Sequence, residues 1–191
     1  MMHRPVLSVA PAAEPITLAE AKAHLRVDHD DEDTLIAALV SASVAHLDGW
    51  TGILGRCVIT QTWVQAFDAF SYRLRLPFPD VSEVVVTYTD DDDQEQTVSA
   101  TDYTLLEDYF GSYVEFDSGF SRPSVGPDSA GVVVTLTAGY GDADAVPAAL
   151  KAAMLLHIGT LYEYRETLAP GDVRTSLAYE ALIAPYRRVG V

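Results

Sequence analysis

The feature that most constrains the fold is a change in hydrophobic period along the chain. Apolar residues recur at helical spacing over residues 16–52 and again after Pro147. Between these stretches, from about Arg56, apolar and polar residues alternate, which is the period of a half-buried strand. The sequence therefore predicts an α+β fold, with a helical bundle formed by N- and C-terminal helices and a β-rich insertion between them.

Two helices are expected in the N-terminal stretch. The first begins at Thr17, which forms a capping-box sequence with Glu20. The second begins near Asp30, because the carboxylates of residues 30–33 favour the first turn of a helix. Gly49 and Gly52 end it. The apolar face of the second helix comprises Leu35, Ile36, Leu39, Val40, Val44 and Leu47.

The remaining elements follow from alternation and from breakers. Residues 83–89 and 94–98 are expected to form a hairpin around the acidic turn 90–93. Pro147 opens a third helix, and Pro185 stops a last helix over residues 176–184. The other expected strands cover residues 58–65, 72–76, 103–106, 113–116 and 132–137.

These elements divide the chain into three parts. Residues 1–15 contain three prolines and are expected to form an extended N-terminal arm. Residues 16–55 and 145–191 form the helical domain, and residues 56–144 form the β-rich insertion. The apolar run from Leu35 to Leu47 is too short to span a bilayer, and no signal peptide is recognisable, so we expect a soluble protein.

The charge balance excludes one class of partner. The chain has 12 Lys and Arg against 28 Asp and Glu, a net charge of −16. Tight DNA or RNA binding needs a basic surface, which this composition does not supply. Copies of the chain also repel one another, so an oligomer needs specific contacts.

Candidate metal and catalytic sites are weak. Residues 28–33 superficially resemble a calcium loop, but the sixth and twelfth positions hold Asp33 and Leu39 where an EF-hand needs Gly and Glu. The acidic run 90–93 is expected to be a solvated turn. His157, on an apolar stripe, is more simply a core histidine than a ligand, and Cys57 a small buried residue. We therefore expect no cofactor, no metal and no enzyme; a hydrolase or metal-dependent enzyme is the minor alternative.

Two clusters could bind other proteins. Tyr162, Tyr164 and Arg165 combine aromatic rings with arginine, as interface hot spots do, although tyrosines at a helix end also pack in cores. Tyr186, Arg187 and Arg188 follow the last helix and contain the only adjacent basic pair. They form either an ordinary charged tail or a plug for an acidic groove.

Several segments, taken in order, resemble the phage head–tail connector proteins, the neck adaptors of long-tailed phages and gene transfer agents. The N-terminal segment Ile16–Val27, followed by Asp30–Asp33, is similar to the start of these proteins. The resemblance extends over nearly the whole chain and fits the subgroup with a β-rich insertion. The other matching segments are Thr51–Gly52, Ile59–Trp63, Thr137–Gly141, Val146–Pro147, Leu161–Glu166 and Leu182–Arg187.

The resemblance implies a structural protein of the virion or phage-like particle, made in the bacterial cytoplasm. Such adaptors form a twelvefold ring between the portal and the tail-side neck or stopper protein, and extend the DNA channel without binding DNA specifically. A C-terminal segment often docks on the portal, which gives Tyr186, Arg187 and Arg188 a portal-binding role and leaves Tyr162, Tyr164 and Arg165 for the subunit interface. A tail-completion protein or another minor neck protein is the alternative.

Overall fold

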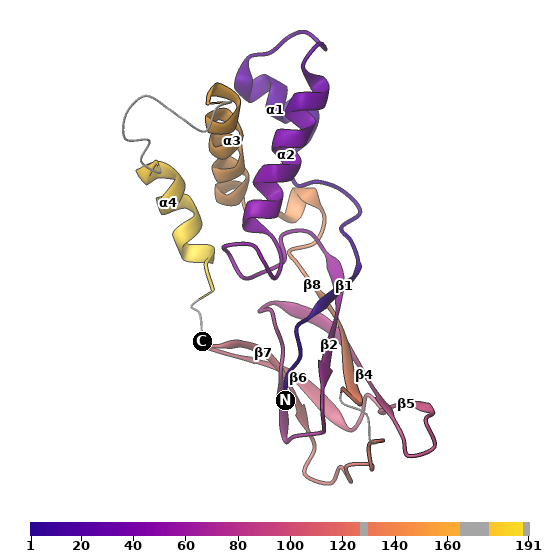
Figure 1. Cartoon of the computed structure of the whole chain (residues 1–191). Coiled ribbons are helices and arrows are strands. Elements are labelled where there is room, and N and C mark those ends of the chain that lie inside the picture. Colours follow the sequence, from indigo (N-terminus) through magenta and orange to yellow (C-terminus); the bar gives the residue numbers. More distant parts are fainter. Residues whose placement is uncertain (127–129, 165–175, 189–191) are drawn as a thin grey trace. The chain divides into compact units, whose positions relative to one another are not determined.

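The computed structural model describes residues 1–126, 130–164 and 176–188, and its chain divides into two compact units (Figure 1). The first unit, called the β unit here, comprises Met1–Pro11 and Thr60–Gly139. The second, called the helical unit, comprises Ala12–Ile59 and the described residues from Tyr140 to Arg188. Each unit is therefore assembled from segments that are distant in the sequence.

The helical unit contains the four α-helices of the described chain. Thr17 caps the first of them in the predicted capping box: the Glu20 N–H donates to Thr17 Oγ1 at 3.1 Å, and the Thr17 N–H donates to Glu20 Oε2 at 2.7 Å. Pro147 directly precedes the third helix and Ser176 the fourth, as predicted. The helices are α1 (Leu18–Leu25), α2 (Asp33–Leu47), α3 (Ala148–Glu163) and α4 (Leu177–Ile183), and two short 3₁₀ turns, η1 (Ala143–Ala145) and η2 (Ala184–Tyr186), accompany them.

One core holds the helical unit together, and both ends of the chain contribute to it. Side chains from α1, α2, α3 and α4 belong to this single buried cluster. Removing their apolar surface from water is the main stabilising contribution to such a unit. Its fully buried members include Ala21, Ile36, Leu47, Leu150, Ala153, Met154, Ile158 and Ile183.

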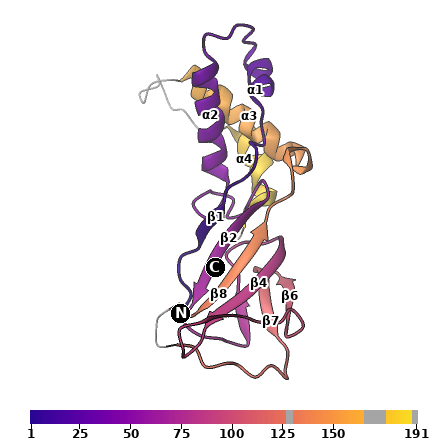
Figure 2. The ribbon, with the colours of Figure 1, turned by 90° about the vertical axis from the view of Figure 1, so that its right-hand side faces the viewer.

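The β unit contains two antiparallel sheets (Figure 2). The five-stranded sheet has the order β1-β2-β8-β4-β5, and the three-stranded sheet has the order β3-β7-β6. The predicted hairpin is confirmed, since Thr87 pairs with Thr97 and Thr89 with Glu95. The strands are β1 (Val6–Val9), β2 (Gln61–Phe67), β3 (Arg73–Arg75), β4 (Val81–Thr89), β5 (Glu95–Thr97), β6 (Tyr103–Asp108), β7 (Gly111–Phe116) and β8 (Val132–Ala138).

Each sheet has one buried face and one outer face. Along β2 and β8 every second residue is buried, so Trp63 and its partner Leu136 lie on the buried face. Aromatic rings connect the buried sides of the two sheets: Phe70 contacts Tyr88 of β4 at 5.5 Å and Phe116 of β7 at 5.4 Å between ring centroids. The residues of this core do not belong to the buried cluster of the helical unit.

Part of the predicted N-terminal arm is a strand. Residues 6–9 are extended, as the flanking Pro5 and Pro11 indicate, but they form β1 and pair with β2, Val6 opposite Val64 and Leu7 opposite Trp63. All four residues of β1 are exposed, so the strand has no alternating burial from which it could be recognised.

The predicted α+β class is confirmed, with helices and antiparallel sheets in one chain. The second helix begins at Asp33, three residues later than expected, because residues 30–33 form a turn in which the Asp33 N–H donates to the Asp30 carbonyl oxygen at 3.2 Å. None of the helices in the described part of the chain combines the length and the apolar character needed to cross a bilayer.

Candidate interaction sites

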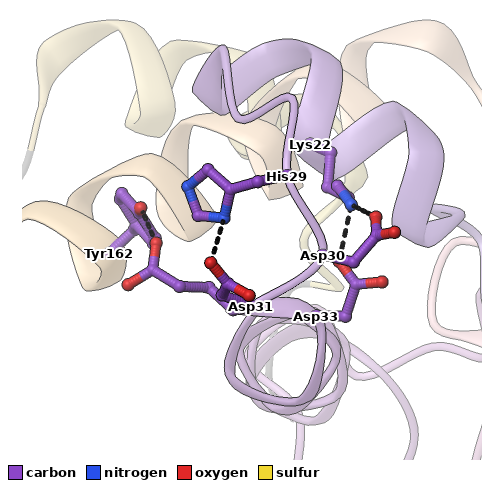
Figure 3. Close-up of polar contacts among 7 residues, drawn as sticks. Lys22, His29, Asp30, Asp31, Asp33 and Tyr162 are labelled. Atoms are coloured by element: carbon purple, nitrogen blue, oxygen red, sulfur yellow. Dashed lines mark hydrogen bonds and ion pairs between the residues drawn. The ribbon is translucent and has the colours of Figure 1, made fainter.

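The acidic segment between α1 and α2 is organised by one lysine (Figure 3). Lys22 Nζ donates to Asp30 Oδ1 and to Asp33 Oδ1, both at 2.6 Å. The hydrogen bond from Lys22 lowers the pKa of Asp30, and the hydrogen bonds to Asp30 and Asp33 raise the pKa of Lys22. His29 Nδ1 lies 3.7 Å from Asp31 Oδ2. The carboxylates of Asp30 and Asp33 are thus paired with a lysine of the same chain. The sequence did not predict this role of Lys22.

The calcium-loop alternative finds no support in this arrangement. Among residues 1–126, 130–164 and 176–188, no group of three or more His, Cys, Asp or Glu could hold a metal ion. The second acidic run is a turn, in which Asp90 Oδ1 accepts the N–H groups of Asp92 and Gln94 at 3.0 and 2.9 Å. Cys57, the single cysteine of the chain, is buried, as predicted.

The interface candidates on α3 separate in the structure. The Tyr162 hydroxyl donates to Glu32 Oε2, so it connects the end of α3 to the start of α2 within the chain (Figure 3). The Tyr164 side chain directly follows α3 and is 49% exposed. Arg165 lies outside the described residues. Tyr162 is therefore engaged internally, whereas Tyr164 is accessible for a contact with another molecule.

The portal-binding candidates form the end of the described helical unit. Tyr186 lies in η2 and packs against the helical core. Arg187 is exposed, and its guanidinium lies 3.3 Å from Glu180 Oε2. The Arg188 N–H donates to the Leu54 carbonyl oxygen at 2.9 Å. Its Cβ approaches Gly55 so closely that a Cβ added there, at a backbone φ of +63°, would lie 3.3 Å away. Of the three, Arg187 presents the most accessible charge.

A histidine pair lies between three helices of the same unit. His157 of α3 is half-buried, with its ring 4.9 Å from the exposed His46 of α2 and 5.7 Å from Tyr179 of α4. Burial, and then the charge of His46, lowers the pKa of His157. His157 is thus a half-buried packing residue whose neutral form is favoured.

Comparison with known proteins supports the sequence resemblance over part of the chain. Residues 15–70 match the family model described as the phage gp6-like head-tail connector protein. The matched segment includes the capping box, the acidic turn, α2 and the first central strand. Curated protein sequences gave no match.

Solved structures match over nearly the whole chain. One is a chain from the neck of an empty GTA particle computed with C6 symmetry, with a TM-score of 0.78 and 24% identity over 99% of this chain and 97% of that one. A second, from the virion of a native gene transfer agent (GTA) particle, has a TM-score of 0.80, 24% identity and the same coverage. A third, from the neck of a native GTA particle computed with C12 symmetry, has a TM-score of 0.71 and 22% identity, again covering 99% and 97%.

These findings show that this chain shares its fold with chains of solved gene transfer agent particles. The resemblance to head–tail connector proteins is confirmed where the family model matches, over residues 15–70. At identities of 22–24% the likeness of the whole chain to the GTA structures establishes the fold, including the β-rich part that the family model does not reach.

Proposed function

We propose that this chain is a head–tail connector of a phage or phage-like particle, a structural subunit at the junction of head and tail. The observation that carries the proposal is the shared fold over 99% of the chain, combined with the family match over residues 15–70. In this proposal residues 16–55 and 145–191 form the helical adaptor domain and residues 56–144 a β-rich insertion. The protein is not an enzyme.

The connector forms a ring of twelve copies beneath the portal and extends the DNA channel toward the tail-side neck protein. Symmetry of order six and twelve in the related neck structures supports a ring of this kind. Twelve copies of −16 carry a formal charge of −192. Because DNA is also negatively charged, an acidic lumen lets it pass without adhering.

Electron microscopy of the purified chain, alone and mixed with the portal of the same particle, tests the proposal. Rings that stack coaxially on the portal are expected. A chain that remains monomeric and does not bind the portal would overturn the connector function. A pull-down with separated portal and tail fractions distinguishes the tail-completion alternative, because a tail-completion protein binds the tail fraction alone.

Deletion of the gene provides a test in the particle. Without the connector, assembly should yield DNA-filled heads that lack tails or lose their DNA. Normal infectious or transducing particles from a clean deletion would contradict the proposal.

A further inference from the structure

The tight turn between β6 and β7 carries two exposed aromatic side chains. Tyr109 is 80% exposed and Phe110 is 46% exposed. Asp108 precedes them and Gly111 follows them, an order that is typical of a type I turn. The Phe110 N–H donates to Asp108 Oδ1 at 2.8 Å, and Gly111 has a φ of +110°. Because this hydrogen bond and this turn geometry fix the backbone, the two aromatic residues lose little backbone conformational entropy when they bind a partner.

Arg75 fixes this turn from the neighbouring strand β3. Its two terminal nitrogens donate to the two carboxylate oxygens of Asp108, each at 2.8 Å. The hydrogen bond from Arg75 lowers the pKa of Asp108 to about 2, so the pair is charged at neutral pH. The guanidinium also lies 5.6 Å from the centroid of the Phe110 ring. The Tyr109 and Phe110 rings contact each other edge to face at 5.4 Å.

The turn continues into the outer face of the three-stranded sheet. There the guanidinium groups of Arg73 and Arg75 lie over the Tyr113 ring, at 5.0 and 5.3 Å from its centroid. Arg73 pairs with Glu115, its neighbour across the ladder, as Arg75 pairs with Asp108. Both arginines are thus neutralised locally. Tyr113 itself is only 8% exposed, so the accessible part of this surface combines the Tyr109 and Phe110 rings with the two arginines, the composition of an interface hot spot.

A second surface lies on the outer face of the five-stranded sheet. Its central rows consist of valine, threonine and alanine, and the charged side chains in the paired rows of this face are Glu83 and Glu95, near its margin. Val6 of the edge strand is 64% exposed and Val85 of β4 is 42% exposed. In a chain of net charge −16, a face whose central rows are uncharged and carry exposed valines is suited to burial against another protein.

We propose that the Tyr109–Phe110 turn of one copy docks on the outer face of the five-stranded sheet of a second copy. This inference rests on the proposed ring, since a cyclic assembly joins two different surfaces of each subunit head to tail. The charges favour a second copy as the occupant. Acidic copies repel one another in general, but contact between these two surfaces adds little to that repulsion, because Arg73 and Arg75 are paired with carboxylates on the first surface and Glu83 and Glu95 lie near the margin of the second.

Cross-linking between two variants, each with one added cysteine, tests the pairing. Thr104→Cys lies on the outer face of the three-stranded sheet, and Thr135→Cys lies at the centre of the valine-rich face, opposite Val64 and Val85. After mixing and reassembly, a short bismaleimide should join the two variants to each other. Neither variant alone, nor the wild-type chain with its buried Cys57, should form a cross-linked dimer. An assembled mixture without this product would overturn the inference.

A double variant tests the aromatic pair itself. Tyr109→Ser with Phe110→Ser should raise the concentration needed for assembly about 30-fold, the effect of losing a hot-spot contact. The matched control is Leu177→Ser, at an apolar position of the helical unit that is 88% exposed, and it should assemble as the wild type does. Normal assembly of the double variant on the portal would overturn the docking contact and leave the connector function standing. A wild-type chain that neither assembles nor binds the portal would overturn both.

Discussion

At the scale of single residues, some of the side-chain hydrogen bonds within the helical unit join positions far apart in the chain. Tyr162 and Glu32 are separated by 130 residues, yet the tyrosine hydroxyl donates to the carboxylate. The sequence predicted Tyr162 as a candidate interface residue from its type and position. The hydrophobic pattern of a sequence does not show which distant residue a side chain contacts in the folded chain. The family resemblance gave matching segments in their order along the chain, but it did not predict the contact between Tyr162 and Glu32.

Replacement of Tyr162 by phenylalanine measures that internal bond. The change removes the hydroxyl donor and leaves the half-buried Glu32 carboxylate without it, so the free energy of unfolding should fall by about 1–2 kcal/mol. Urea unfolding measures the difference. Tyr164→Phe is the control, because that side chain is 49% exposed and should tolerate the change. Equal losses for both variants would contradict the assigned contact.

His157 should make the helical unit sensitive to pH. Its pKa is lowered by burial, so the folded state prefers the neutral ring. The resulting stability is fully present above the unfolded value near 6.5 and is lost as the pH falls below it. His46 of α2 and Tyr179 of α4 are the titratable groups whose rings contact it.

Urea midpoints at pH 7.5 and pH 5.5 test this dependence. The midpoint of the wild-type chain should fall more between these two values than that of His157→Phe, which keeps a ring but cannot be protonated. His24→Phe, at an exposed position of α1, is the matched control and should behave as the wild type does. An identical fall in the wild type and in His157→Phe would exclude His157 as the source.

At the scale of elements, local signals in the sequence predicted most of what the structure contains. The capping box of Thr17, Pro147 before α3 and the alternation in β2 are each local to a few residues, so they can be recognised directly in the sequence. The strand β1 was not predicted because its burial does not alternate. The division of the strands into two sheets depends on pairings between distant segments, which a local pattern does not encode.

The turn after α2 offers a test at this scale. A Cβ added at Gly52 would lie 2.3 Å from the carbonyl oxygens of Leu47 and Asp48, so alanine requires the backbone to move. Gly52→Ala should lower the free energy of unfolding by about 1–3 kcal/mol. Gly119→Ala is the control, because a Cβ at Gly119 meets no atom within 4 Å. Urea unfolding of both variants decides the matter, and indistinguishable curves would contradict the close approach.

At the scale of the whole molecule, the net charge of −16 means that exposed lysine and arginine side chains are few, so each is a candidate for contact with an acidic partner. Arg187 and Arg188 end the described helical unit, and the first of them forms only an exposed pair with Glu180. Exposed pairs of this kind contribute little to stability, about 0–1 kcal/mol. A charge change here therefore reports on binding more than on folding.

Arg187→Glu with Arg188→Glu should weaken attachment to the portal while the subunit remains folded. The matched control is Arg4→Glu with Arg122→Glu, which makes the same change in net charge at two exposed positions of the β unit. Sedimentation with portal particles measures attachment, and circular dichroism checks the fold. Equal attachment of both double variants and the wild type would remove the portal-binding role from this segment.

The order of strands in the five-stranded sheet also governs how the protein can be made. β8 lies between β2 and β4, yet it is the last strand of the sheet to leave the ribosome. Until residues 132–138 emerge, β2 and β4 each present an unpaired edge, which is a hazard for aggregation. The helical core likewise waits for α3 and α4. The β unit can thus be completed only after β8 has been made, and the helical unit only after α3 and α4 have been made, so a new subunit cannot assemble while only its N-terminal segments have left the ribosome.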